Sequence, residues 1–274
     1  MSSLVMPKSE EIYFQSNDVV VFNQLARKFP MDWVSQKEFY NWLEIAKQEI
    51  AESIPGAKIV EKETARDNPP LNTAIYYDTP DRQILPTGAL LRTSCNKITH
   101  AFCAFKMAED EQSVRKDHRY VFEGIQKETI QRSPDSDASV NIVQGLLRRT
   151  DIEHPGFFLQ QAYGVDPSQL IPSIRLDSLR YGFFVWLDRK DALRCSIDRY
   201  DVVDLWKPEE QRVTLPVAEV ELAIYPRISE EVAADGRVIQ LIQYLSDSLI
   251  NTFGTHVTTD IKYQRSAQKL DIAY

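Results

Sequence analysis

The segment 216–227, PVAEVELAIYPR, alternates between two kinds of side chain and constrains the fold more than any other feature of the chain. Alternate residues of a β-strand point to opposite faces, so one face of this strand is apolar and the other carries Glu219 and Glu221 side by side. Two neighbouring carboxylates repel each other unless positive charge lies opposite them. We therefore expect the polar face of this strand to meet Lys and Arg side chains from other strands. The apolar face consists of Ala218, Val220, Leu222 and Ile224.

Similar short runs recur along the chain, and several of them also have one charged row and one mostly apolar row. In the run 88–96, for example, Arg92 and Ser94 share one face. Runs of this kind, several of them separated by turn-forming residues, favour antiparallel β-structure. We predict an α+β fold in which a closed antiparallel eight-stranded barrel has a polar lumen and helices packed outside. The eight runs are 18–29, 73–79, 88–96, 99–108, 114–123, 179–188, 193–203 and 215–225.

Three helices are predicted from apolar side chains at helical spacing. The first opens at Ser35, and Glu38 three residues later completes a capping box. The second covers about 138–149. The third covers about 229–253 and ends near Gly254, because glycine readily adopts the conformation that follows a helix.

Charge and composition narrow the range of partners. The net charge of −8 at pH 7 gives no general basic excess for binding nucleic acid or an anionic membrane, although it leaves room for a local basic pocket. No stretch approaches the roughly 20 apolar residues of a membrane span. The three cysteines have no CxxC spacing, which predicts small buried thiols and a reducing, cytoplasmic location. The four histidines lack HxH or HExxH spacing and are predicted not to bind metal.

No internal repeat and no Pro/Gly/Ser-rich linker divides the chain, so we predict a single domain. Its bounds are residues 18–268, with a flexible N-terminal tail over 1–17 and a short C-terminal tail over 269–274. The sequence contains no GxSxG, Walker or GxGxxG motif, so it gives no support to a serine hydrolase, a P-loop protein or a Rossmann fold.

Seven short motifs in order, from about residue 20 to 268, resemble those of the triphosphate tunnel metalloenzymes, the CYTH superfamily. The most specific is TAIYYDTPDRQILPTGALLRTS over 73–94, which is similar to the family's tyrosine-aspartate-threonine turn followed by a strand that bears an arginine, here Arg92. The other six are FKMA with Lys106, VRKD with Arg115, a strand-opening Arg180 after LIPSIRLDS, SIDRYD with Asp198, AEVELA with Glu219 and Glu221, and IKYQRS with Lys262 and Arg265.

This resemblance implies a tunnel in which basic side chains bind a chain of phosphates and glutamates hold Mg²⁺ or Mn²⁺. A triphosphate carries about four negative charges, which several Lys and Arg residues must balance, and Mg²⁺ prefers hard oxygen ligands. By resemblance, Lys28, Glu219 and Glu221 would be catalytic, and the two glutamates would hold the metal ion. The implied phosphate-binding set is Lys28, Arg92, Lys106, Arg115, Arg180, Lys262 and Arg265.

The N-terminal motif departs from the family's pattern. The family's Glu-x-Glu-x-Lys strand would fall on QLARKFPMD, where Gln24 and Ala26 take the acidic positions and Lys28 remains. Ala223 stands where a third acid is often found. We therefore expect one Mg²⁺ or Mn²⁺ at most, held by the two glutamates and phosphate oxygens. In the alternative interpretation, the two glutamates pair with lysines of the tunnel, and the site binds an anion through its cations alone.

Three functions fit these residues. The first is a metal-assisted phosphohydrolase acting on inorganic triphosphate or an organic triphosphate. The second is a diphosphate-ester lyase or cyclase on the same fold, either a terpene cyclase acting on a prenyl diphosphate or an adenylyl cyclase. An apolar ligand would suit Phe102 and Phe184, which share strand rows with cations. The third is a non-catalytic polyphosphate or nucleotide binder. In each case the expected partner is a small-molecule phosphate, and the sequence leaves a homodimer open.

Overall fold

The computed structural model describes residues 26–31, 33–61, 69–108, 117–225 and 228–274. Nine antiparallel strands form one sheet in the order β1-β9-β8-β7-β3-β4-β5-β6, and β2 pairs with β7 beside that path. Two predicted positions, Gln24 and Arg115, lie outside the described residues. The strands are β1 (Ala26–Met31), β2 (Ala57–Glu61), β3 (Leu71–Asp78), β4 (Leu90–Asn96), β5 (Ala101–Lys106), β6 (Asp117–Val121), β7 (Ile171–Leu187), β8 (Lys190–Asp204) and β9 (Thr214–Ile224).

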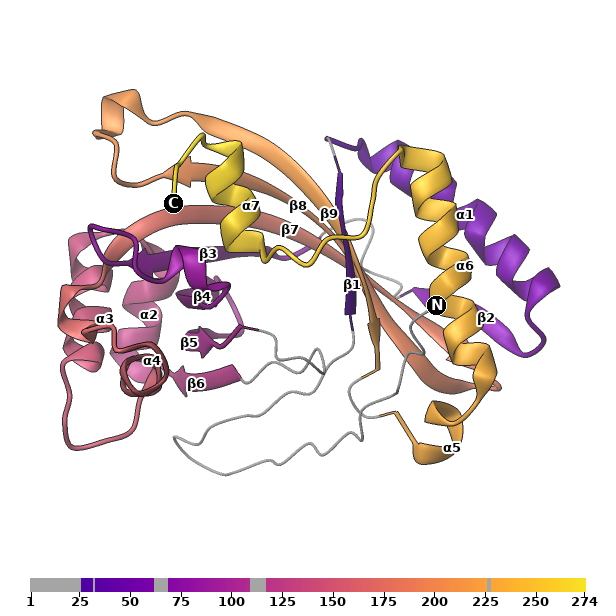
Figure 1. Cartoon of the computed structure of the whole chain (residues 1–274), viewed down its shortest axis with the longest axis horizontal. Coiled ribbons are helices and arrows are strands. Elements are labelled where there is room, and N and C mark those ends of the chain that lie inside the picture. The colour runs from indigo at the N-terminus through magenta and orange to yellow at the C-terminus, as the bar shows by residue number, and fades with distance from the viewer. Residues whose placement is uncertain (1–25, 32, 62–68, 109–116, 226–227) are drawn as a thin grey trace.

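The predicted closed eight-stranded barrel is not confirmed. The sheet has nine strands, and its path ends at β1 and β6, which share no backbone pairing among the described residues. The strand β7 is long enough for one of its edges to pair with β3 up to Leu179 and then with β2 from Phe183 onward. The sheet therefore changes partners along a single strand and curves into an arch (Figure 1). The backbone N–H of Thr258 donates to the carbonyl of Lys28 at 2.9 Å and covers part of the outer edge of β1.

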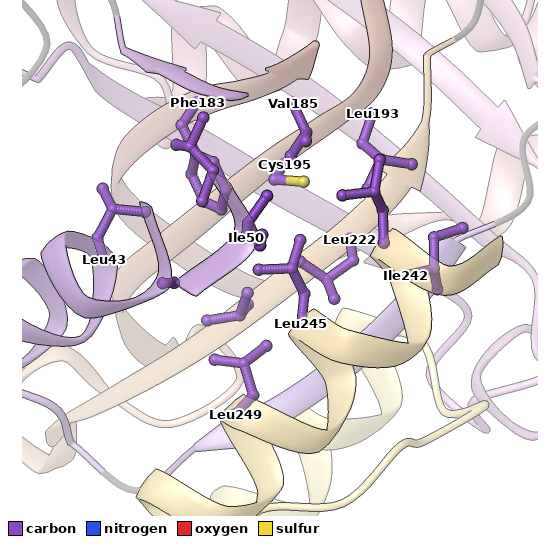
Figure 2. Packing of buried hydrophobic residues seen from close by; sticks show 14 of the residues in the cluster. Leu43, Ile50, Phe183, Val185, Leu193, Cys195, Leu222, Ile242, Leu245 and Leu249 are labelled. Atoms are coloured by element: carbon purple, nitrogen blue, oxygen red, sulfur yellow. The ribbon is translucent and has the colours of Figure 1, made fainter. Parts of the chain in front are cut away.

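Three helices cover the outer face of one half of the arch, formed by β1, β2, β8, β9 and the second half of β7. Figure 2 shows Leu43 and Ile50 on one helix and Leu245 and Leu249 on another, packed over sheet residues such as Leu222. All five side chains are fully buried, and burial of each contributes roughly 1.5–3 kcal/mol. The apolar row predicted for β9 therefore lies in this core. The helices are α1 (Gln36–Ser53), α5 (Glu230–Ala233) and α6 (Gly236–Phe253).

A second group of helices covers the outer face of the other half of the arch, formed by β3 to β6 (Figure 1). Here His118 stacks on Phe158 with ring centroids 3.9 Å apart. His154 caps a helix by accepting a hydrogen bond from the backbone N–H of Phe157. These two histidines thus have structural roles, and the three cysteines are buried and free, as predicted. The helices are α2 (Gly124–Arg132), α3 (Asp137–Leu147) and α4 (Pro155–Tyr163).

The last helix, α7 (Lys262–Lys269), packs against the opposite, inner face of the sheet. Tyr263 stacks on Tyr76 of β3 with centroids 4.7 Å apart and planes 7° from parallel. Its hydroxyl donates to Asp78 at 3.0 Å. Asp78, the aspartate of the sequence's most specific motif, also accepts backbone hydrogen bonds from Thr79, Ile84 and Leu85. This aspartate therefore fixes a turn and anchors α7 to it.

The helices predicted from the sequence are found with changes at their ends. The capping box of Ser35 and Glu38 opens α1. The single helix predicted over 229–253 is divided into α5 and α6, because Asp235 interrupts it and caps α6. That helix ends at Gly254, whose φ of 64° explains the glycine. The elements β2, α2, α4 and α7 were not predicted. Among the described helices, none has the length and apolar character needed to cross a bilayer.

Candidate functional site

The inner face of the arch holds a pocket of about 690 Å³, and the charged side chains that the structure describes in its lining are all basic. Its described lining residues come mainly from β3, β4, β5, β7 and β8, with one contribution from α7, and no Asp or Glu is among them. Cations gathered in this way repel one another, so they need either carboxylates behind them or an anion bound in front of them. The cations of the lining are Arg92, Lys106, Arg119, Arg180, Arg194 and Lys262.

Behind one wall of the pocket lies Asp198, which is 1% exposed. Strand register aligns it with Arg180 of β7 on one side and Glu219 of β9 on the other. Arg180 donates to both of its oxygens, at 2.7 and 2.6 Å, and Lys262 donates at 2.7 Å. Burial raises the pKa of Asp198, but Arg180 and Lys262 outweigh it and hold that pKa well below its ordinary value. Asp198 is therefore a charged anchor that orients two cations.

Glu219, predicted to hold a metal ion, is also buried, at 4% exposure. The ammonium of Lys262 lies 2.9 Å from one of its oxygens, and the guanidinium of Arg265 contacts the other. Arg265 is itself buried, and burial lowers its pKa. Both oxygens of Glu219 therefore face cations of α7, which is the geometry of the ion-pair interpretation.

Glu221 has different surroundings from its neighbour two residues away. It is half-buried and stands opposite Lys28 of β1 and Ser196 of β8 in the strand register. In the part of the chain that the structure describes, no hydrogen bond or ion pair to its carboxylate is found. The next position on the same row is Ala223, which faces Ala26 of β1, so neither supplies an oxygen ligand. Glu221 is thus an isolated carboxylate on the inner face.

The opposite wall, on β4 to β6, carries three cations and one carboxylate. Asp117, 2% exposed, pairs with Lys106 at 3.1 Å and with Arg119 at 3.0 Å. Burial raises the pKa of Asp117, yet these two cations outweigh it, and the pKa is lowered. Arg92 has no ion pair with any described residue, and its Nε is buried without a hydrogen-bond partner. The guanidinium of Arg92 is therefore available to an anion in the pocket.

Aromatic side chains share this lining with the cations. Phe102 and Phe184 both face the pocket, as their rows in the sequence indicated. The guanidinium of Arg119 lies 4.3 Å from the ring centroid of Phe102, a cation–π contact that fixes both groups. The pocket can thus receive a ligand with both a charged and an apolar part.

The residues of the pocket do not form the metal site that the resemblance implies. Among the described residues, no three His, Cys, Asp or Glu side chains gather where they could hold a metal ion. Glu219 is occupied by Lys262 and Arg265, which leaves Glu221 as the carboxylate that could reach a cation. Mg²⁺ binds through near-octahedral oxygen ligands, and one carboxylate supplies few of them. The requirement for Mg²⁺ or Mn²⁺ stays a prediction.

No protein-family profile and no curated protein sequence matches the chain. Solved structures do match it. A candidate adenylate cyclase from Bacillus halodurans is similar with a TM-score of 0.50 and 14% identity, covering 89% of this chain and 96% of that chain. The chain shares the fold of this protein. At this identity the likeness establishes a shared fold and says nothing of the reaction.

Two further structures match with lower scores. One is a candidate adenylyl cyclase from Hippeastrum, described as having a dominant triphosphatase activity, with a TM-score of 0.47, 12% identity and coverage of 89% of this chain and 96% of that chain. The other is the mimivirus capping enzyme triphosphatase, with a TM-score of 0.32, 10% identity and coverage of 85% and 88%.

Within this fold, the predicted phosphate-binding residues separate into three groups. Four line the pocket: Arg92, Lys106, Arg180 and Lys262. Arg265 lies behind the lining against Glu219, and Lys28 stands at the β1 edge opposite Glu221. The remaining member of the set, Arg115, lies outside the described residues.

Sequence reasoning missed two cations of the lining. Arg119 alternates with Asp117 on one strand row, and Arg194 alternates with Ser196 and Asp198 on another. Strand parity alone would have placed both on the polar face, because each shares a row with polar or charged neighbours at a spacing of two. Neither matches a position that carries the family resemblance, so the resemblance did not indicate them.

Proposed function

We propose that this protein binds the phosphate chain of a small molecule in the pocket on the inner face of its arch. One observation carries the proposal: six Lys or Arg side chains line the pocket, and no Asp or Glu is found among its described lining residues. A triphosphate brings about four negative charges, and charge-assisted hydrogen bonds from Lys and Arg are the strong interactions available to it. Arg92, which has no carboxylate partner among the described residues, is the first cation expected to engage the ligand.

The bound chain would lie between the two walls of the pocket. Arg180 uses Nε and Nη2 to hold Asp198, and Nη1 remains free of that contact. Arg119 similarly reaches Asp117 through Nη2. Because the carboxylates behind them fix both guanidinium groups, little side-chain entropy is lost when they bind phosphate oxygens. The proposed ligand is therefore held by donors that are already oriented.

Hydrolysis of the bound chain is a second candidate, favoured by Glu221. A carboxylate without a described ion pair can accept a proton from an attacking water, which is the role of a general base. Release of inorganic phosphate from triphosphate, abolished in the Glu221→Gln variant with binding retained, would support hydrolysis. A lyase or cyclase would instead release diphosphate together with a hydrocarbon or cyclic product.

The binding proposal is tested by calorimetry and thermal shift with inorganic triphosphate, ATP and a prenyl diphosphate. A ligand at 100 times its Kd stabilises the folded state by about 2.7 kcal/mol, so the melting temperature should rise with at least one of them. The Arg92→Ala variant should lose most of this shift. Arg148→Ala, which removes an exposed arginine on the outer helices, should keep it. No response to any of the three compounds would contradict the proposal.

A further inference from the structure

Three described carboxylates around the pocket, those of Asp198, Glu219 and Asp117, already have cationic partners, and this limits what else they can bind. Asp198 holds two cations, Arg180 and Lys262, through three hydrogen bonds of 2.6 to 2.7 Å. Glu219 holds Lys262 and Arg265. A divalent ion at either carboxylate would have to displace a buried or half-buried cation, which would then lose its counter-charge. Displacing a charge in this way is strongly unfavourable inside a protein.

Asp117, on the other wall, is engaged in the same way by Lys106 and Arg119. A further acidic residue of the inner face, Glu221, is followed on its row by Ala223, which faces Ala26, so neither of these two side chains offers an oxygen atom; Ser196 of β8 stands opposite Glu221. The charge of Glu221 also acts on Arg180 and helps to raise the pKa of that arginine. Glu221 is therefore part of the electrostatic surroundings of a cation already present in the pocket.

Lys262 is central to this arrangement because it bridges two acidic strands from α7. Its ammonium lies 2.7 Å from Asp198 and 2.9 Å from Glu219 while it also lines the pocket. It sits 4.6 Å from the ring centroid of Tyr200, a further contact that holds a cation in this position. A positive charge coordinated by two carboxylates and turned towards a phosphate chain occupies the place that a divalent ion would need.

We infer that the pocket binds its phosphate ligand through side-chain cations alone. Lys262 and Arg180, which are paired with Asp198 and Glu219, take the position in which a metal ion would bridge protein and phosphate. The inference rests on the proposed function and concerns how the same site works. According to this inference, Glu219 is the counter-ion of Lys262 and Arg265 on α7. The acidic pair in the sequence then serves to position cations.

The deciding experiment is calorimetric titration of the full chain with inorganic triphosphate, in EDTA and in millimolar Mg²⁺. Binding in EDTA should be as tight as in Mg²⁺, or tighter, because Mg²⁺ competes for the free anion. A loss of tenfold or more in EDTA would overturn the inference and leave the proposed function intact. No binding in either buffer would overturn the proposed function and the inference with it.

A substitution at Glu219 gives the second readout, since the two roles predict opposite signs. If Glu219 is a counter-ion, Glu219→Gln frees positive charge and tightens triphosphate binding in EDTA by about tenfold, the equivalent of one charge-assisted contact. If it is a metal ligand, the same change weakens binding in Mg²⁺. Glu153→Gln, an exposed control distant in sequence from the sheet, should change neither value. If Glu219→Gln does not fold, the EDTA comparison on the unaltered protein still decides.

Discussion

The two walls of the pocket use the same kinds of side chain for different purposes. On the wall formed by β7, β8, β9 and α7, two carboxylates, Asp198 and Glu219, are buried between Arg180, Lys262 and Arg265. Charges there nearly balance, and the short contacts tie three strands to a helix far along the chain. The ion pairs of this wall therefore stabilise the fold as well as orienting cations of the pocket.

Counting only the residues that the structure describes, the wall formed by β4, β5 and β6 has a larger excess of positive charge. Asp117 is the carboxylate among the described residues that balances Lys106 and Arg119, and Arg92 has no such partner. The comparison teaches that the number of basic residues at a pocket is a poor guide to ligand binding. The positive charge left unbalanced by buried carboxylates is a better one.

The largest difference between the walls should appear in stability. Asp198→Asn leaves Arg180 without its counter-charge and Lys262 with Glu219 alone, and should cost about 3 kcal/mol of unfolding free energy. Asp117→Asn should cost about 1 kcal/mol, because Lys106 and Arg119 are 26% and 27% exposed and can turn towards water. Urea unfolding of both variants measures this, and equal losses would mean that the walls do not differ.

The next largest effect should appear in binding. Arg92→Ala should weaken triphosphate binding by about 2 kcal/mol, roughly thirtyfold, with little change in stability, because the side chain has no ion pair to lose. Arg265→Ala should do the reverse, because that arginine is buried against Glu219. Calorimetry and urea unfolding on the same two proteins test the contrast. Arg92→Ala binding as tightly as the unaltered chain would contradict it.

A smaller effect is expected from pH. The pKa of Asp198 and that of Asp117 are both lowered in the folded state, so their contribution to stability is complete above the ordinary aspartate pKa of about 3.9. It is lost as pH falls from about 5 towards the folded-state values. The unfolding free energy, measured between pH 7 and pH 3, should therefore fall at the acid end. The slope of unfolding free energy against pH should be shallower in Asp198→Asn. An unchanged slope in that variant would remove Asp198 as the cause.

The smallest effect concerns the attachment of α7 to its wall. Tyr263→Phe keeps the ring stacked on Tyr76 but removes the hydroxyl that donates to Asp78 at 3.0 Å and lies 2.9 Å from Ser173. The buried acceptor then loses one of its donors, which should cost about 1 kcal/mol. Urea unfolding measures the loss. A cost above that of Asp198→Asn would show that the turn at Asp78, more than the ion pairs, secures the helix.

The polar faces of the strands could be predicted from the sequence, since alternation is a local property. Alternation by itself assigns Arg92, Lys106 and Arg180 to polar rows, and all three line the pocket. The closure of the sheet could not be predicted in this way, because it depends on which strands meet at the edges and on β7 changing partners between β3 and β2. The five-residue strand β2 carries too short a pattern to be detected from its sequence alone.

The site was harder to predict than the strands. The sequence indicated that Lys262 and Arg265 belong with Glu219, yet nothing in it showed that they lie on a helix that folds back over the inner face. Whether a glutamate holds a metal ion or an ammonium is decided by the groups in direct contact with it. Here those groups come from a segment far along the chain, and nothing within the motif itself indicates them.

The pairing of β1 with β9 joins Lys28 to Glu221, and the hydrogen bond from Tyr263 to Asp78 spans 185 residues. Contacts between such distant parts of a chain form late and slowly, because closing long loops costs entropy before any contact compensates for it. In an incompletely collapsed chain, the cations of the pocket would therefore not yet be paired with Asp198 and Glu219. A polyanion present during refolding would meet these exposed charges first, and it should change the rate at which the protein reaches its final state as well as the stability of that state.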